Sequence, residues 1–204
     1  IAGILILPGC GTGIWDILGF GGGEGHPPAE RMWTVMVYVA AANNMESVTK
    51  LNLNQMEKVG SRSSLSILVQ LDTKNYCNRY LITRDNDEQT FTSPVITRMP
   101  HQNSGDPDVL SDFLRWGKEN YPARHYALIL WNHGSGWKPK SSSASLRAIC
   151  FDDLSNDALD TDELREALES AGVKLDFLGL DACLMQMVEV ATEVKDWAQI
   201  VCGS

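Results

Sequence analysis

Four short and almost wholly apolar runs constrain the fold of this chain more than any other feature of its sequence. They are TVMVYVAA at 34–41, LSILVQL at 65–71, HYALILW at 125–131 and FLGL at 177–180. Runs of this length without polar alternation are typical of strands that are buried on both faces, as in parallel sheets. Segments with helical spacing of apolar residues separate the runs, at 45–59, 106–121 and 160–171. The alternation predicts a mostly parallel central sheet with helices on both faces, an α/β/α sandwich.

Smaller elements complete the expected sheet. The section at 80–97 mixes apolar and polar residues, which indicates a hairpin or edge strands. Further short strands are expected at 148–151 and 200–202. Asp160, with Glu163 three residues on, predicts the capped start of a helix.

Cys183 follows the last apolar run, after Asp181 and Ala182, and a run with helical spacing begins directly behind it. This order predicts a cysteine at the carboxyl end of a strand, where open α/β sheets form their binding crevices. A helix beginning at this point would favour the thiolate over the thiol. The position therefore suits a nucleophile. The alternative is a buried and inert cysteine, because free cysteine is among the most buried residue types.

A second strand, 125–131, runs directly into Asn132, His133 and Gly134. If the two strands are neighbours, His133 can take the thiol proton of Cys183 and later donate it to a leaving amine. The backbone N–H groups of Gly134 and Cys183 are candidate oxyanion donors, since glycine allows a close approach of the backbone. The alternative for His133 is a turn residue that is satisfied by backbone groups.

Composition limits the classes of partner and cofactor. The 204 residues are 44% hydrophobic, enough for one domain with a full core, and the formal charge is −9. Without a lysine/arginine block, a nucleic-acid-binding surface is not indicated. Five cysteines show no CxxC spacing, and the four histidines do not cluster with them, so no metal site or disulfide framework is predicted. Asp152 and Asp153 are expected to face solvent, and the acids show no EF-hand spacing.

The N-terminal segment has a different character from the rest of the chain. Residues 1–7 are apolar and lead into Leu7-Pro8-Gly9-Cys10, which resembles the box at which bacterial lipoprotein signals are cut and the cysteine is lipidated. A glycine- and proline-rich stretch follows, which suits a flexible tether. We therefore expect a signal remnant and tether at 1–31 and a folded domain at 32–204. The protein would be an envelope lipoprotein or secreted, touching the membrane only through its lipid anchor. The alternative is an ordinary signal peptide or a disordered leader with a chance cysteine.

Three segments in order carry a resemblance to a known family. They are WTVMVY at 33–38 with Ala40, Asn43 and Asn44, then ILWNHGSGW at 129–137, then DACLM at 181–185. Together they resemble the clostripain family of cysteine peptidases, which has a caspase-like fold. Over 32–204, the resemblance implies a His133–Cys183 dyad, to which no third member can be assigned. It implies no cofactor for the chemistry, with calcium as a possibility. Because relatives continue further, the domain is expected to be incomplete at its C-terminus.

The resemblance also implies specificity. Asp181 matches the acidic residue that precedes the nucleophile in the family, which implies cleavage after arginine or lysine. A buried carboxylate at the floor of a crevice would pair with a guanidinium or ammonium group. The alternative is a strand-end acid that accepts N–H bonds from the following helix start.

Family members are often zymogens that cut themselves after a basic residue between the histidine and the cysteine. The basic, serine-rich stretch KPKSSSASLR at 138–147 is expected to be an exposed loop. Arg147-Ala148 is the expected bond, with Lys138 and Lys140 as lesser candidates, and the product would be a two-chain monomer. The alternative is a surface loop that is merely flexible.

The sequence thus predicts a cysteine endopeptidase that acts on proteins or peptides with Arg or Lys at the cleaved bond. Two other functions remain open. One is a non-catalytic lipoprotein binding domain on the same fold, in which Cys183 would be buried. The other is a cysteine amidase or transpeptidase that uses the same dyad on a different acyl donor.

Overall fold

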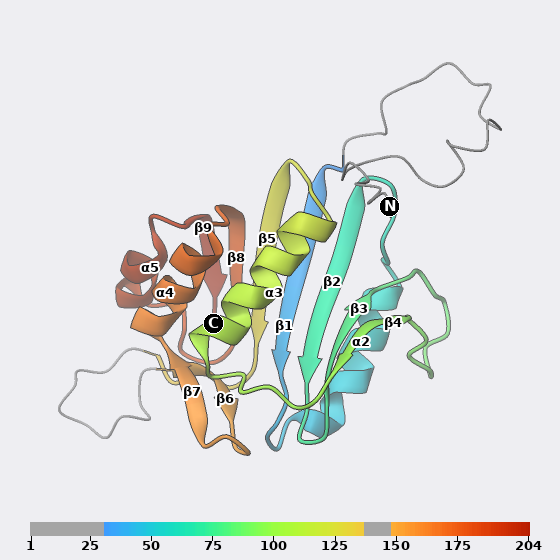
Figure 1. The fold of residues 1–204 in the computed structure, drawn as a ribbon, viewed down its shortest axis with the longest axis horizontal. Helices are drawn as coiled ribbons and strands as arrows, with labels where there is room; N and C mark the ends of the chain where they lie inside the picture. Colours follow the sequence, from blue (N-terminus) through green and yellow to red (C-terminus); the bar gives the residue numbers. More distant parts are fainter. Residues whose placement is uncertain (1–30, 137–147) are drawn as a thin grey trace, which may run out of the picture.

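The computed structural model of the chain describes residues 31–136 and 148–204. Within them, a seven-stranded sheet has the order β4-β3-β2-β1-β5-β8-β9 (Figure 1). The strands are β1 (Trp33–Ala40), β2 (Leu65–Asp72), β3 (Cys77–Leu81), β4 (Val95–Met99), β5 (His125–Trp131), β8 (Leu175–Asp181) and β9 (Ala198–Gly203). Strands β2, β1, β5, β8 and β9 are parallel, whereas β3 runs antiparallel to both of its neighbours. The expected mostly parallel central sheet is confirmed.

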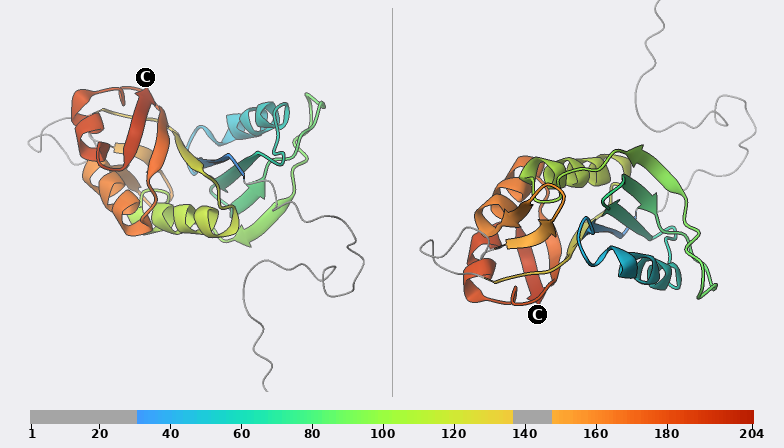
Figure 2. Two further views of the ribbon diagram at one scale, coloured as in Figure 1. Left: turned by 90° about the horizontal axis from the view of Figure 1, so that it is seen from above. Right: turned by 90° about the horizontal axis from the view of Figure 1, so that it is seen from below.

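Helices cover the sheet on both faces. They are the short 3₁₀ helix η1 (Glu46–Val48), α2 (Thr49–Glu57), α3 (Pro107–Asn120), α4 (Thr161–Ala171) and α5 (Val188–Val194). Helices α3 and α4 lie on one face and α2 on the other (Figure 2). Strand β1 shows why its run is apolar throughout. Met36 and Tyr38 join the core under α3, while Val37 and Val39 join the core on the side of α2.

Helix ends agree with the signals in the sequence. The side chain of Asp106 accepts from the backbone N–H of Asp108 at the start of α3. Asp160 and Glu163 form the expected capping box at the start of α4. This helix ends at Gly172, whose φ of 61° is one that glycine adopts without strain. No helix among the described residues is long and apolar enough to cross a membrane.

Two parts of the chain differ from the sequence-based expectation. The helix expected directly behind Cys183 begins only at Val188, because Leu184 has a φ of 63° that no right-handed helix can contain. Cys183 therefore does not lie at a helix N-terminus. The second difference is a small hairpin of β6 (Ala148–Asp152) and β7 (Asp157–Asp160) at the carboxyl edge of the sheet. Strand β7 was missed because four residues with two terminal aspartates show no alternation of apolar and polar positions.

Candidate active site

The two candidate catalytic residues follow neighbouring strands at the same edge of the sheet. Strands β5 and β8 are parallel, and Trp131 pairs with Asp181 at the last position of their ladder. His133 and Cys183 each stand two residues beyond that pair, so both follow neighbouring strands at the carboxyl edge of the sheet. Both side chains are exposed. The arrangement meets the condition under which an imidazole can serve a thiol.

The loops that carry these residues pack closely against each other. A Cβ atom at Gly134 would lie 2.8 Å from Met185 Cγ and 2.9 Å from Ala182 Cβ, and would also meet the carbonyl oxygen of Cys183. Gly136 has a φ of 68° and lies against Leu184 in the same way. The sequence predicted that Gly134 lets the backbone approach a substrate. The structure gives a further reason for glycine, which is close approach to the loop of Cys183.

Asn44 supplies a partner for the imidazole that was not identified in the sequence. Its Oδ1 atom lies 2.8 Å from Nε2 of His133. An amide oxygen only accepts, so Nε2 carries the hydrogen in this contact and Nδ1 is the basic nitrogen of the neutral ring. In the sequence, Asn44 was noted only as one of the residues that resemble the clostripain family, and no role was predicted for it. The available signal was a polar residue just behind a buried strand, at the edge where two other strands end in reactive groups.

Two further asparagines hold these turns in place. The side-chain amide of Asn132 donates to the carbonyl oxygen of Phe151 over 3.0 Å and also to that of Ala40. Asn43 donates to the same two carbonyls, over 2.8 Å to Phe151 and 3.2 Å to Ala40. Both amides are buried, and they tie the ends of β1, β5 and β6 together. Since Asn43 and Asn132 directly precede Asn44 and His133, this connection fixes both members of the imidazole contact.

Leu184, directly behind Cys183, is another feature that the sequence did not indicate. Its left-handed backbone is uncommon for a residue with a side chain, and such conformations persist where the surrounding structure holds them. Its side chain is exposed, whereas the next residue, Met185, is fully buried. The backbone thus turns sharply after Cys183, which is itself exposed.

Asp181 differs from its predicted environment. The carboxylate was expected to be buried, but the residue is exposed at the end of β8. The alternative role as a cap is not supported, because α5 starts at Val188 and not directly behind Cys183. Within the described part of the chain, the carboxylate has no hydrogen-bond or ion-pair partner. It is therefore available to a cationic group from outside.

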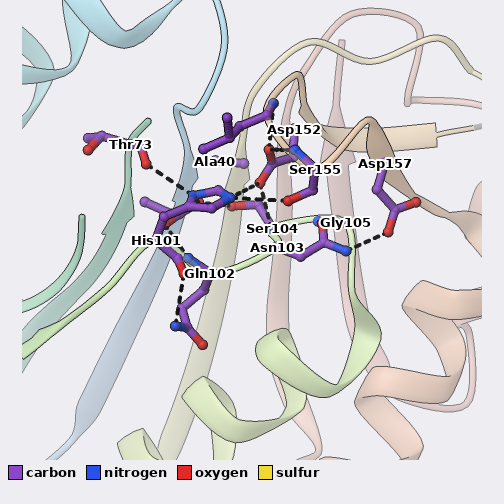
Figure 3. A network of polar contacts seen from close by, with 12 residues as sticks. Ala40, Thr73, His101, Gln102, Asn103, Ser104, Gly105, Asp152, Ser155 and Asp157 are labelled. Carbon is purple, nitrogen blue, oxygen red and sulfur yellow. Dashed lines mark hydrogen bonds and ion pairs between the residues drawn. The ribbon is translucent and has the colours of Figure 1, made fainter. Parts of the chain in front are cut away.

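A second, buried cluster lies at the same edge and was also missed. His101 lies between Asp72 and Asp152, with Nδ1 3.1 Å from Asp72 Oδ2. Its other nitrogen, Nε2, lies 3.5 Å from Asp152 Oδ2 (Figure 3). We call these three residues the Asp–His–Asp network. Asp152 was expected to face solvent, and that expectation is wrong. Its carboxylate is buried because it accepts the backbone N–H groups of Ser104 and Ser155, whereas Asp153 is exposed as expected.

Burial changes the acidity of this network. It raises the pKa of Asp72 from its ordinary 3.8 to about 6, although hydrogen bonds from Gln102 and Ser104 and the nearby His101 act in the opposite direction. Asp72, at the end of β2, accepts hydrogen bonds from Gln102 and Ser104 in the segment before α3. The Asp–His–Asp network therefore holds together three segments that are distant in sequence.

The Asp–His–Asp network brings together three side chains that can bind metal ions. Its ligand-type atoms lie within 4.8 Å of one another. However, both oxygens of each carboxylate already accept hydrogen bonds, from Gln102 and Ser104 on Asp72 and from Ser104, Leu154 and Ser155 on Asp152. Calcium binds six to eight oxygen ligands, and an imidazole supplies none. The described residues do not fit calcium here, and we derive no step through it.

Some predicted sites lie outside the described residues. They are Cys10, Lys138, Lys140 and Arg147. Ala148, on the other side of the expected activation bond, is the first residue of β6. Its backbone N–H donates to Ser135 Oγ over 3.0 Å, and its carbonyl accepts from the N–H of Ser135 over 3.1 Å. The strand that begins at Ala148 is thus joined to the loop of His133.

Known proteins resemble this chain in sequence and in fold. Clostripain from Hathewaya histolytica is 32% identical over 189 residues, which cover 79% of this chain and 36% of that protein. A secreted C11 cysteine protease from Bacteroides thetaiotaomicron, solved with an irreversible peptide inhibitor, matches with a TM-score of 0.68 and 28% identity. The match covers 83% of this chain and 48% of that one.

An inactive zymogen C11 protease from Parabacteroides distasonis matches with a TM-score of 0.70 and 24% identity, over 88% of this chain and 50% of that one. This likeness supports the fold alone. The chain spans about a third of the curated relative and about half of these solved chains. The model of the clostripain family matches residues 37–204, which is most of the sequence. The chain therefore belongs to the clostripain family, with the caspase-like α/β fold of the C11 proteases.

Proposed function

We propose that the protein is a cysteine endopeptidase whose dyad is His133 and Cys183 and which cleaves after arginine or lysine. The observation that carries the proposal is that His133 and Cys183 lie at the same edge of the sheet. The exposed imidazole of His133 and the exposed thiol of Cys183 each follow one of two neighbouring parallel strands, β5 and β8. Asn44 holds Nε2 of the imidazole, which leaves Nδ1 for the thiol. Family membership and the peptide-inhibited relative support the same chemistry.

The reaction follows from these groups. Nδ1 of His133 takes the proton of the Cys183 thiol, and the sulfur attacks the carbonyl carbon of the peptide bond. The backbone N–H groups of Gly134 and Cys183 are proposed to stabilise the resulting oxyanion. As the C–N bond breaks, His133 returns its proton to the leaving amine, and a thioester remains. Water, deprotonated by His133, then hydrolyses the thioester and restores the thiol.

Asp181 is proposed to select the residue before the cleaved bond. It stands two residues before the nucleophile, at the exposed end of β8, and has no protein cation to neutralise it in the described part of the chain. A carboxylate in this position attracts a guanidinium or ammonium group, and the planar guanidinium can bind both of its oxygens. No cofactor takes part in the proposed chemistry.

Activation is proposed to occur by self-cleavage at Arg147-Ala148, with Lys138 and Lys140 as secondary sites. Because Ala148 opens β6, the new N-terminus would lie at the start of a strand that is tied to Ser135, Asn43 and Asn132. The product would be a two-chain monomer.

The cellular placement also stays a proposal. We propose export, either with lipidation of Cys10 or as a secreted protein, and a division into a tether at 1–31 and a peptidase domain at 32–204. The relative from Bacteroides thetaiotaomicron is described as secreted. Lipidation is tested by mass spectrometry of the mature N-terminus.

One alternative loses support and another stays in competition. A non-catalytic binding domain was expected to have Cys183 buried, yet the residue is exposed. An amidase or transpeptidase would use the same dyad, and only the acyl donor and acceptor would differ. The comparison with a peptide-inhibited protease favours peptide substrates.

The test uses the full-length protein and fluorogenic peptides that end in arginine, lysine, aspartate or leucine. We expect turnover of the arginine and lysine peptides only, with loss of turnover in Cys183→Ala. Cys202→Ala is the matched control, since Cys202 is the other exposed cysteine of the described residues. Mass spectrometry of the wild-type protein should find a new N-terminus at Ala148. Turnover that survives Cys183→Ala would contradict the proposal, and a change of cleaved peptide in Asp181→Ala would establish the specificity residue.

A further inference from the structure

A polar pocket of about 540 Å³ borders the candidate active site. It is lined by residues that follow β1 in the sequence, by the start of α2 and by the turn that follows β2. They include Asn44, Glu46, Lys50, Thr73, Lys74 and Tyr76. None of them belongs to the proposed dyad or to the proposed site for arginine and lysine.

Asn44 joins this pocket to the imidazole. It lines the pocket, and its Oδ1 atom is 2.8 Å from Nε2 of His133. The strand order β8, β5, β1, β2 places Cys183, then His133, then the residues of the pocket in a row along the carboxyl edge of the sheet. The pocket therefore lies beyond His133 as seen from Cys183.

The chemistry of the leaving group decides which part of a peptide reaches this side. The imidazole returns its proton to the nitrogen of the cleaved bond, so that nitrogen must face His133. The chain that continues from the nitrogen then begins beside His133. Resting on the proposed function, we propose that the pocket binds the first two or three residues after the cleaved bond and favours acidic side chains there.

Charge supports the preference for acidic side chains. Lys50 on α2 and Lys74 behind β2 approach the pocket from two elements, and both are exposed. Neither ammonium group has an ion-pair partner among residues 31–136 and 148–204, and Glu46 is the acid among the lining residues. The pocket thus carries a local excess of positive charge in a chain whose formal charge is −9. A carboxylate that follows the cleaved bond would meet uncompensated cations.

The expected activation bond is followed by Ala148 and Ile149, which offer no charge to the pocket. Self-cleavage within one molecule does not need such a contact, because the covalent link keeps the bond at a high effective concentration. The preference for acidic residues therefore concerns external substrates.

The test compares quenched fluorescent peptides that differ only in the second residue after the cleaved arginine, which is Glu, Ala or Lys. We expect kcat/KM to fall in that order, by about two- to fivefold for each exposed ion pair. Lys50→Glu combined with Lys74→Glu should reverse the order. Lys195→Glu, an exposed lysine at the end of α5, should leave it unchanged. Higher salt should weaken the preference.

An arginyl coumarin amide separates the inference from the function on which it rests, because it has no residues after the cleaved bond. Its turnover should be the same in the wild type and in the double variant. If it is cleaved but the order Glu, Ala, Lys is absent or survives in the double variant, the inference is wrong. A changed preference for arginine before the bond would also overturn it, because the pocket would then serve the other side. If neither substrate is cleaved, the proposed function fails and the inference with it.

Discussion

The carboxyl edge of the sheet holds two imidazoles in contrasting environments. His133 is exposed, and the one side-chain contact found for it in the described residues is with Asn44. His101, by contrast, lies between two buried carboxylates, and both of its ring nitrogens have partners. An imidazole that transfers protons needs a nitrogen open to the reacting groups, whereas one that stabilises a fold has its hydrogen-bonding capacity filled. The two histidines therefore differ in how many hydrogen-bond partners their ring nitrogens have.

The two regions are also linked. Asp152 of the Asp–His–Asp network is preceded by Phe151, whose carbonyl oxygen accepts from Asn43 and Asn132. These asparagines precede Asn44 and His133. The buried region thus supports the turns of the exposed one, and the comparison can be tested by changing each imidazole in turn.

The largest expected effect comes from His133→Ala. Loss of the base and acid should lower kcat/KM by about a thousandfold or more. The melting temperature should stay within the range of a neutral surface substitution, because the side chain is exposed. Peptide hydrolysis and calorimetry on the same sample give both values. A large loss of stability would mean that this histidine is structural as well.

His101→Ala should show the opposite pattern. Removal of the ring deletes its contacts with two buried carboxylates, and each buried polar group that is left unpaired costs about 1–3 kcal/mol of unfolding free energy. Denaturant unfolding measures this loss. Thr192→Ala, an exposed substitution on α5, is a suitable control. If His101→Ala unfolded at the same midpoint concentration of denaturant as the wild type, the network would not stabilise the fold.

Asn44→Ala tests the contact between Asn44 and the imidazole of His133, which is proposed to be catalytic. We expect kcat to fall about tenfold to a hundredfold, with a smaller change in KM, because the ring loses its fixed orientation but the substrate contacts remain. The pH dependence of kcat/KM should also shift, which a purely structural role would not produce. Asn44→Gln, which keeps the amide group, should recover part of the rate. Equal rates for the wild type and Asn44→Ala would exclude this positioning role.

The smallest effect concerns the pH dependence of stability. Since burial raises the pKa of Asp72 from 3.8 to about 6, the folded state binds this proton more tightly than the unfolded state. The contribution to stability is therefore full below pH 3.8 and is lost as the pH rises through about 6. His101 and Asp152 face this group, and burial raises the pKa of Tyr38 and Cys77 away from this range.

Unfolding of the wild type and Asp72→Asn between pH 4 and pH 7 measures this term as a difference. The wild type should lose stability relative to the variant as the pH rises through that interval, because asparagine does not titrate. Parallel curves for the two proteins would contradict the assignment to Asp72.

The sequence was sufficient for features that depend on neighbouring residues. The apolar runs that end at Trp131 and before Asp181 predicted two parallel strands, and the residues that follow each run suggested the candidate dyad, on the condition that the strands are neighbours. The helical segment at 106–121 and the cap at Asp160 were visible for the same reason. Each of these signals is contained in a few consecutive residues.

The features that were missed depend on contacts between distant segments. Asp152 is buried because the segment around Ser104 folds over it, and nothing near Asp152 in the sequence indicates this. Asn44 becomes a partner of His133 only because β1 and β5 are neighbours. Leu184, with its left-handed backbone, lies close to Gly136, which is distant from it in the sequence. Periodicity does not report such contacts.

The hydrogen bonds to the carbonyl oxygen of Phe151 have a consequence for the degradation of the protein. It belongs to the part of the chain that carries Cys183, yet its donors, Asn43 and Asn132, belong to the part that carries His133. After a cut between these parts, each would hold half of the dyad and half of the hydrogen bonds that position it. The two polypeptides would then behave as one unit of turnover, in which degradation of either piece removes the activity of both.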